Sequence, residues 1–465
     1  MAFTKTMPKI VAGVDSSTQS VKVVLREADS GELIASTSRP HPDGTEVDPH
    51  EWKRALDSAL DEVSKYKIDA ISIGGQQHGM VALDSTGKVI RHALLWNDTR
   101  SDQAAHQLNT EIPDIHLRTG SKLVASFTAS KVRWLADHER ENANKVAAIA
   151  LPHDWLSWHL SGASSLDTLF TDRSDASGTG YFDATKNQYC RDIFATALRN
   201  SKDVTLPKIV APHQCGGETL SGIKISAGAG DNASAALGLG AGVGDLVISL
   251  GTSGTAFAVS AVPTHDPSGE VAGFADATGH YLPLACTLNA AKIFNTVATT
   301  LGLTFDQFSE LAITATPGAE GLRVIPHFDG ERTPNLPQAR GRFHGITHSN
   351  FTRSNIARAA IEGVLAGMVY ATQALEKLGV SHSRVLLIGG AAKNPAVQQI
   401  AADFFGKEIQ LPPTGEYVAD GAAKQAAWAL SEKSLPPEWN LGEVKKISPQ
   451  ASSKDVVAEY MELIN

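Results

Sequence analysis

Two stretches of the chain show the same order of apolar and polar positions. Residues 10–15 form an apolar run, IVAGVD, which a polar turn separates from a second apolar run, VKVVLREA, at residues 21–28. Residues 244–259, GDLVISLGTSGTAFAV, repeat this order around a Gly/Ser/Thr turn. Apolar runs that flank a short turn of small polar residues predict β-hairpins. The repetition indicates an internal duplication in which each half of the chain begins with a hairpin.

The rest of the pattern predicts alternating strands and helices. Further strands are expected at GELIAS, DAISIGGQ, MVALD, ALLWND and RVLLIGG. Helices are expected at about 49–65, after the glycine turn of LIGGAAKN with Val397, Ile400 and Phe404 on the apolar face, at 415–431 and near the end of the chain. Residues 125–160 are helix-rich. We therefore expect an α/β fold. The glycine-rich stretch GLGAGVGD divides the chain into two predicted domains, residues 8–241 and residues 242–465.

Composition excludes several classes of protein. Hydrophobic residues make up 42% of the 465 residues, as in globular proteins that bury a core. The net charge is −9 and no run of Lys and Arg occurs, so nucleic acid is not an expected partner. Three scattered cysteines without a CxxC pair are typical of a reducing compartment. No signal peptide and no apolar run of roughly 20 residues is visible, so we expect a cytoplasmic protein without a membrane partner.

The two hairpin turns are candidate phosphate sites. Successive backbone N–H groups in a tight turn, together with Ser and Thr hydroxyls, can cradle phosphate oxygens. Asp15, at the end of the first strand, is a candidate for holding Mg²⁺, which prefers oxygen ligands. Either turn alone favours an ordinary hairpin, because such turns prefer Gly and Ser. The occurrence of both turns at equivalent places favours the phosphate interpretation.

Asp231 is the only charged residue within SAGAGDNASAALGLG, residues 226–240. It is compatible with a simple helix N-cap, for which Asp is a preferred residue. The small residues around it also leave room for a ligand beside the carboxylate. A helix N-terminus stabilises negative charge, so a low pKa is expected. Phosphoryl transfer tolerates a weak base, because its loose transition state depends mainly on positioning.

Two other strand ends carry polar groups after glycines. SIGGQQHG ends a strand with amide and imidazole groups that suit sugar hydroxyls, although this stretch alone favours a capped strand with a satisfied histidine. In LIGGAAKN, a strand runs into Gly389 and Gly390, which allows another molecule to approach the backbone closely. A plain strand-to-helix turn is the alternative there. The chain has no GxxxxGK[ST] motif, so a P-loop is excluded.

In collinear order, these motifs resemble those of the FGGY carbohydrate kinases. The series comprises the first hairpin with its Asp, GQQHG, LLWND-R, GAGDNA, SLGTSG, GERTP and GG-A-N-P, from about residue 10 to about residue 430. Within the family, the chain is most similar to kinases that phosphorylate D-xylulose with ATP and Mg²⁺. The resemblance implies two actin-like, ribonuclease-H-like α/β domains with a central cleft that closes on sugar and ATP. Homodimers are common among such kinases, so a homodimer is one expected assembly.

The resemblance also implies roles for individual residues. Asp231 matches the general base, Gln77, His78 and Asn232 match sugar-contacting positions, and Asp15 matches the Mg²⁺-linked position. The positions that match ATP contacts are Thr18, Gln19, Ser20 and Lys22 in the first hairpin, Gly251, Thr252 and Ser253 in the second, and Gly389, Gly390, Ala391 and Asn394 in the later glycine turn.

Two departures from the family pattern bear on function. The first hairpin reads Asp-Ser-Ser-Thr-Gln-Ser from Asp15, with serines where D-x-G-T-S-G has glycines. Since serine disfavours positive φ, we expect a differently built turn. Gln77 stands where methionine is usual, which affects sugar preference or affinity. The alternative functions are therefore a kinase for another pentulose or polyol, such as ribulose, L-xylulose or ribitol, a catalytically silent sugar or nucleotide sensor, and an actin-like polymerising ATPase.

Overall fold

A computed structural model describes residues 8–440 and 442–464 of the chain. It contains two compact units. Unit 1 comprises the described residues of Met1–Ala241, Gly273–Tyr281 and Gly415–Leu441, and unit 2 comprises those of Gly242–Ala272, Leu282–Thr414 and Gly442–Asn465. The units are therefore not two consecutive stretches of chain, because a late helix returns to unit 1. None of the described helices combines the length and the apolar character needed to cross a bilayer.

The following elements lie before Gly242, where unit 2 begins, with helix α14 of unit 1 added. The strands are β1 (Ile10–Ser16), β2 (Ser20–Glu27), β3 (Leu33–Pro40), β4 (Glu46–Val47), β5 (Ala70–Gly75), β6 (Val81–Leu83), β7 (Ala93–Leu94), β8 (Ala148–Ala150), β9 (Phe170–Asp172), β10 (Phe182–Asp183), β11 (Gln188–Tyr189), β12 (Lys208–Val210), β13 (Cys215–Glu218), β14 (Lys224–Ser226) and β15 (Ala229–Gly230). The helices are α1 (Pro49–Glu62), α2 (Asp102–Glu111), α3 (Ile115–Thr119), α4 (Thr128–His138), α5 (Arg140–Lys145), α6 (Pro152–Leu160), η1 (Leu166–Thr168), α7 (Arg173–Ser177), α8 (Arg191–Leu198), α9 (Asp231–Gly238) and α14 (Tyr417–Ser431).

The remaining elements follow the first unit boundary. The strands are β16 (Asp245–Leu250), β17 (Gly254–Ala258), β18 (Val271–Ala275), β19 (Tyr281–Thr287), β20 (Arg323–Ile325), β21 (Arg342–His344), β22 (Arg384–Ile388), β23 (Ile409–Leu411) and β24 (Lys445–Ile447). The helices are α10 (Ala291–Thr300), α11 (Phe305–Thr314), η2 (Ala319–Gly321), α12 (Arg353–Lys377), η3 (Gly390–Lys393), α13 (Pro395–Phe405) and α15 (Lys454–Ile464).

The same strand order occurs in both large sheets. In unit 1 the strands are ordered β3-β2-β1-β5-β14-β13, with β15 also paired to β5. The other sheet is ordered β18-β19-β17-β16-β22-β23-β24. In the unit 1 sheet, β1 forms an antiparallel hairpin with β2 and pairs in parallel with β5. In the other sheet, β16 likewise forms an antiparallel hairpin with β17 and pairs in parallel with β22. The hairpins predicted from the apolar pattern are therefore confirmed, and both occupy the same place in their sheets.

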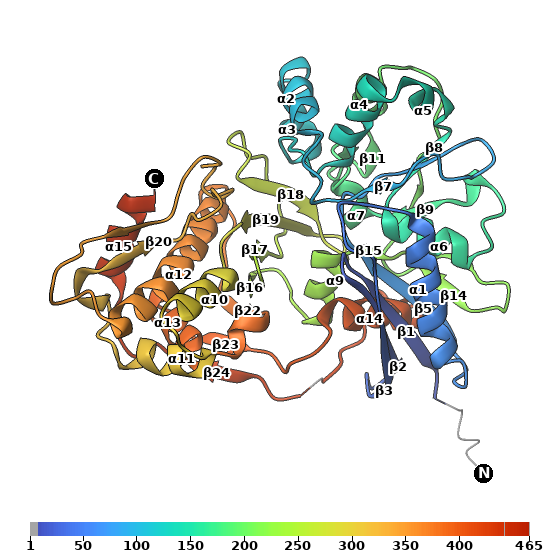
Figure 1. Ribbon diagram of the computed structural model, residues 1–465. Helices are drawn as coiled ribbons and strands as arrows, with labels where there is room; N and C mark the ends of the chain where they lie inside the picture. Colours follow the sequence, from blue (N-terminus) through green and yellow to red (C-terminus); the bar gives the residue numbers. More distant parts are fainter. Residues whose placement is uncertain (1–7, 441, 465) are drawn as a thin grey trace, which may run out of the picture. The chain divides into compact units, whose positions relative to one another are not determined.

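The unit 1 sheet is covered on both faces because successive side chains of a strand point to opposite sides. Val23 and Leu25 of β2 pack in a core with Trp52 and Leu56 of α1. Val24, between them, packs instead in a core with Ala419, Ala423 and Ala426 of α14. Helix α14, drawn in red in Figure 1, thus lies against the blue strands of unit 1 although it comes late in the chain.

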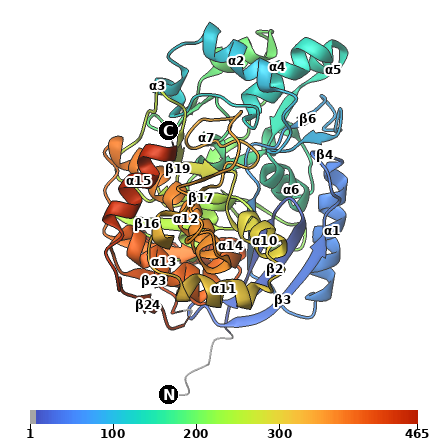
Figure 2. The same cartoon turned by 60° about the vertical axis from the view of Figure 1, so that its left-hand side comes forward.

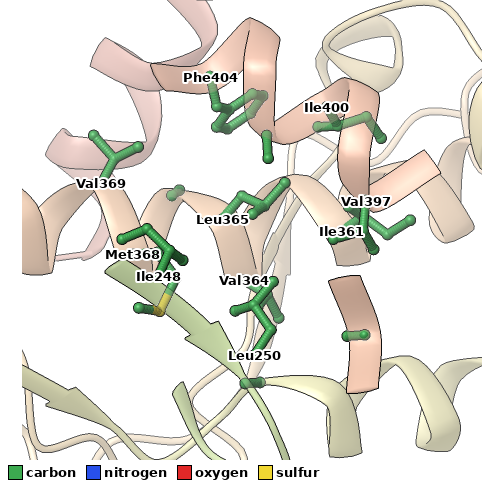
Figure 3. Packing of buried hydrophobic residues seen from close by; sticks show 14 of the residues in the cluster. Ile248, Leu250, Ile361, Val364, Leu365, Met368, Val369, Val397, Ile400 and Phe404 are labelled. Carbon is green, nitrogen blue, oxygen red and sulfur yellow. The ribbon is translucent and has the colours of Figure 1, made fainter. Parts of the chain in front are cut away.

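The unit 2 sheet packs against a layer of helices. The core of this layer includes Ile248 and Leu250 of β16, Leu365 and Met368 of α12, and Phe404 of α13. Figure 2 brings helices α12 and α13 to the front of the view, and Figure 3 shows how their apolar side chains meet those of β16. The long helix α12 is buried over most of its length, as expected for a helix that contacts β17, α10, α11 and α13. This core holds the second hairpin on a rigid support.

Candidate active site

The carboxyl ends of three parallel strands meet at one edge of the unit 1 sheet. β5 lies between β1 and β15, and Gly74 is paired with Asp15 on one side and with Ala229 on the other. β1 and β15 therefore end level with β5, whose last residue is Gly75. Gln76 and Asp231 directly follow two of these strands. The pairing explains why Asp15, the GQQHG stretch and Asp231 gather although they are far apart in sequence.

Asp231 is the first residue of α9, and the N-cap is Gly230, so the N-cap alternative for Asp231 is wrong. The Asp231 carboxylate accepts hydrogen bonds from the backbone N–H of Asn232 at 2.7 Å and from its side-chain amide at 2.8 Å. Burial of the carboxylate raises its pKa to about 7, and the negative charge of Asp15 adds to this effect. The expected low pKa is therefore wrong, because desolvation outweighs the bonds from Asn232.

Asp15 provides a second carboxylate at this edge, and it is buried. Its side chain accepts a hydrogen bond from the Ser17 hydroxyl, and burial raises its pKa to about 6. Among the described residues, no lysine, arginine or histidine forms an ion pair with Asp15 or Asp231. Lys22 bonds instead to Glu416, at 2.6 Å. The buried carboxylate of Asp15 and the half-buried carboxylate of Asp231, neither of them in an ion pair among the described residues, are a donor set that suits a divalent cation.

The first hairpin turn is built without left-handed residues, as expected from its serines. None of residues 16–20 has a positive φ. The backbone N–H of Ser17 donates to the carbonyl of Ser20 at 3.0 Å. Thr18 accepts a hydrogen bond from the indole of Trp96 at 2.8 Å, whereas Gln19 is exposed. The turn is thus closed by its own backbone and braced by a side chain from the LLWND stretch.

Gln77 and His78 both bond to a segment that the sequence analysis did not single out. The Gln77 amide donates to the carbonyl of Ser174 at 3.3 Å, and His78 Nδ1 donates to the carbonyl of Gly178 at 2.6 Å. His78 has a φ of 71°, an uncommon conformation for a residue with a Cβ, which clusters at functional sites. Its ring packs against Phe127 and Phe274.

That segment comprises residues 171–179, TDRSDASGT, and includes α7. Asp172 caps α7 by accepting hydrogen bonds from Ser174 N and Asp175 N. The Ser174 hydroxyl accepts from the backbone N–H of Gly230 at 3.1 Å, next to Asp231. The only signal in the sequence is a run of small polar residues, similar in character to the stretch around Asp231.

The small residues around Asp231 serve packing, so the expectation that they leave room for a ligand is wrong where the structure tests it. A Cβ on Gly230 would lie 2.6 Å from Nε2 of Gln77, and one on Gly228 would lie 2.2 Å from the ring of His153. Gly228 also has a φ of 83°. Within α9, a Cβ on Gly238 would lie 2.2 Å from the carbonyl of Tyr417. The space beside these backbones is already filled by the protein.

Unit 2 brings the second hairpin turn and the later glycine turn side by side. Gly389, with a φ of 95°, follows β22, and a Cβ there would lie 2.6 Å from the Leu250 carbonyl that precedes Gly251. The carbonyl of Gly251 accepts a hydrogen bond from Ala291 N at 3.0 Å. Thr252 and Gly390 are exposed and Ser253 is partly exposed.

Asn394 and Ala391 are turned inward. The Asn394 side-chain oxygen caps α13 by accepting from Ala396 N and Val397 N, and it also accepts from the Ser309 hydroxyl. The N–H groups at the start of α13 are therefore capped by the chain itself. Asn394 is 4% exposed and Ala391 is 2% exposed. Of the predicted residues in this turn, Gly389 and Gly390 offer the accessible backbone.

Comparison with known proteins places the chain in a family. Residues 10–238 match the N-terminal domain of the FGGY family of carbohydrate kinases, and residues 246–430 match its C-terminal domain. The chain belongs to the FGGY family of carbohydrate kinases. Kinases of this family use ATP and act on sugars. The resemblance inferred from the motifs is thereby confirmed.

Relatives with 41–42% sequence identity cover nearly the whole chain. A xylulose kinase of Streptomyces coelicolor is 41% identical over 452 residues, which cover 93% of this chain and 91% of that protein. The crystal structure of a xylulose kinase from Bifidobacterium adolescentis superposes with a TM-score of 0.92 at 42% identity, covering 99% of this chain and 100% of that chain. A gluconate kinase from Lactobacillus acidophilus has the same fold, with a TM-score of 0.87 at 24% identity, covering 98% of this chain and 96% of that chain. The predicted α/β fold with two actin-like domains is confirmed.

Proposed function

We propose that this chain transfers the γ-phosphoryl group of ATP to the 5-hydroxyl of D-xylulose, giving D-xylulose 5-phosphate and ADP. The observation that carries the proposal is the half-buried Asp231 carboxylate, with its raised pKa, beside the GQQHG stretch in a chain 41% identical over 93% of its length to a xylulose kinase. The likeness to relatives of that name favours D-xylulose over other pentuloses and over polyols.

Asp231 is the general base in this proposal. As the sugar oxygen forms its bond to the γ-phosphorus, the bond from that phosphorus to the β-γ bridging oxygen breaks, and ADP leaves. The hydroxyl proton goes to Asp231, whose burial-raised pKa of about 7 suits proton acceptance near neutral pH. Asn232 holds the carboxylate through two hydrogen bonds, and Gln77 and His78 supply polar groups for the other sugar hydroxyls.

Asp15 would hold Mg²⁺ through its bound waters, because it is buried and forms no ion pair among the described residues. When bound, Mg²⁺ neutralises charge on the phosphates. The backbone and hydroxyls of Thr18, Gln19 and Ser20 would contact phosphate oxygens, as would Gly251, Thr252 and Ser253 of the second hairpin. Gly389 and Gly390 would contact the adenosine, while the buried Ala391 and Asn394 would hold their turn in place. Lys22 reaches a phosphate only after leaving Glu416, its partner at 2.6 Å.

The test of this function is ADP release with Mg·ATP across a panel of pentuloses, polyols and aldoses, including a control without sugar. We expect strong stimulation by D-xylulose. Stimulation by a different sugar alone would keep the kinase mechanism but replace the substrate, with Gln77 as the first residue to exchange for methionine. ADP release that no sugar stimulates would contradict the proposal and favour a sensor or an actin-like ATPase. A homodimer is proposed on the family resemblance alone, and sedimentation velocity tests it.

The raised pKa of Asp231 predicts the pH dependence of the reaction. The base acts as a carboxylate, so the protonated form that accumulates below the pKa of about 7 is inactive. We expect kcat/KM for D-xylulose to rise about tenfold per pH unit below that pKa and to level off above it. Initial rates between pH 5.5 and 9 measure this profile. A plateau that extends down to pH 5.5 would contradict a desolvated base.

A further inference from the structure

His153 lies at the start of α6, is fully buried, and is surrounded by acceptor atoms. Its Nδ1 is 2.6 Å from Asp175 Oδ2 and 3.2 Å from Asp154 Oδ1. Its Nε2 is 3.4 Å from the carbonyl of Ala227 and 4.0 Å from Asp172 Oδ1. A neutral imidazole would direct a lone pair at one of these oxygens. Because both nitrogens face acceptors, His153 is an imidazolium with both nitrogens donating.

The charge of His153 is needed in this place. Asp154, Asp172 and Asp175 are each at most 1% exposed, and buried carboxylates are costly unless a positive charge compensates them. The three carboxylates raise the pKa of His153 to about 10, which agrees with the donor geometry. The 2.6 Å contact is a direct charge-assisted hydrogen bond and leaves no room for a metal ion between the two atoms.

The imidazolium is linked to the proposed base by contacts of the backbone. Its ring lies against Gly228, where a Cβ would come within 2.2 Å, and its β-carbon lies against Gly75. Asp175, which receives the Nδ1–H, is adjacent to Ser174 in α7. Ser174 in turn accepts from Gly230 N at 3.1 Å and from the Gln77 amide at 3.3 Å. His153 therefore supports both segments that position Gln77 and Asp231.

We propose that His153 is a positioning residue for phosphoryl transfer, whose imidazolium fixes α7 and residues 227–230 against the end of β5 and so fixes Asp231. The proposal rests on the function proposed above. It adds a requirement for a buried positive charge that never touches the substrate. Loss of that charge shifts Asp231 relative to the sugar hydroxyl, and a misplacement of about 1 Å lowers turnover on the order of 100-fold.

The test compares His153→Gln with a matched control, His159→Gln. His159 lies in the same helix beside Trp155 and Trp158 but outside the carboxylate cluster. In a folded His153→Gln variant we expect kcat for the sugar reaction to fall about 100-fold while KM for ATP stays within about twofold. His159→Gln should behave as the wild type. Wild-type kcat in folded His153→Gln would overturn the proposal.

The pH profile separates positioning from a general loss of stability. The titratable groups that face His153 are Asp154 of α6 and Asp172 and Asp175 at α7, and Asp175 also interacts with Asp231 and Tyr181. Without the imidazolium these negative charges are uncompensated, so the acid limb of the kcat/KM profile should move to higher pH. A merely structural role predicts two different results. The acid limb of the kcat/KM profile would stay at the wild-type pH, and the loss of activity would match the fraction of unfolded protein.

Two further measurements cover the other outcomes. If His153→Gln does not fold, Ser174→Ala is tested instead, because it removes only the hydroxyl that accepts from Gly230 N. We expect Ser174→Ala to lower kcat by less than about 100-fold and to leave KM for ATP unchanged. A crystal structure of the folded variant should show residues 227–231 displaced, and an undisplaced segment would overturn the proposal. Absence of sugar-dependent turnover in the wild type would contradict the proposed function, while the crystal structure would still decide the positioning of residues 227–231.

Discussion

Asp231→Asn is expected to lower kcat for D-xylulose about 1,000-fold, because an amide cannot accept the proton of the attacking hydroxyl. The substitution keeps the size of the side chain, and its carbonyl oxygen can still accept hydrogen bonds from Asn232, as the carboxylate does at 2.7 Å. The sugar pocket should therefore keep its shape. We expect D-xylulose affinity, measured by isothermal titration calorimetry, to change by only a few-fold while turnover in a coupled ADP assay collapses.

The control for this prediction is Asp84→Asn. Asp84 lies in the exposed turn after β6, where its carboxylate accepts from Thr86 N and Lys88 N, and asparagine can do the same. Asp84→Asn should retain wild-type turnover. If Asp231→Asn kept more than a few per cent of wild-type kcat, Asp231 would not be the base. An equal loss of sugar affinity and of turnover would place Asp231 in substrate binding instead.

Local patterns predicted the hairpins because a hairpin is specified by adjacent residues. Each pair of apolar runs encloses a short stretch of turn-forming residues, 16–20 in the first hairpin and 251–253 in the second. Both stretches form turns between paired strands in the structure. The resemblance implied roles for Asp15 and Asp231, and strand pairing on either side of β5 explains why one sheet edge gathers them. The hairpins depend on local contacts, whereas this edge depends on pairing between strands that are far apart in the sequence.

The network behind the site was not predictable in the same way. His153 bonds to Asp175 across 22 residues, and Gly230 bonds to Ser174 across 56 residues. A histidine in PHDW and a serine in TDRSD carry no local sign of such partners. The pKa of Asp231 was misjudged for a related reason: the helix start is visible in sequence, whereas the desolvation that outweighs it depends on tertiary packing.

The small residues of α9 were misinterpreted because two explanations predict the same composition. Glycine and alanine near a carboxylate suit a bound ligand, but they equally suit a helix that must approach another helix closely. The structure shows the second case, with α9 crossing α14 in unit 1. The Ser234 hydroxyl donates to the Val418 carbonyl at 2.7 Å, and a Cβ on Gly421 would lie 1.8 Å from the carbonyl oxygen of Ser234.

Gly421→Ala is therefore expected to destabilise unit 1 strongly. The added methyl overlaps the backbone of α9, which no side-chain rotation can relieve, so α9 and α14 must move apart. Overpacking of this kind costs about 3 kcal/mol. For a unit of this size, that corresponds to a fall of roughly 10 °C in Tm, measured by thermal unfolding. Since alanine is the better helix former, helix propensity alone predicts the opposite sign.

Gly367→Ala in α12 isolates the steric contribution. Gly367 also lies inside a helix, but a Cβ there meets no atom within 4 Å. We expect that variant to match or exceed wild-type stability by up to about 1 kcal/mol, because it gains helix propensity without overlap. Gly421→Ala should also lower kcat in the molecules that remain folded, since α9 begins with Asp231 and its displacement moves the base. If both variants gained stability alike, the close crossing of α9 and α14 would not be what requires glycine at position 421. If Gly421→Ala lost stability but kept full kcat, the crossing would set the stability of unit 1 without setting the position of Asp231.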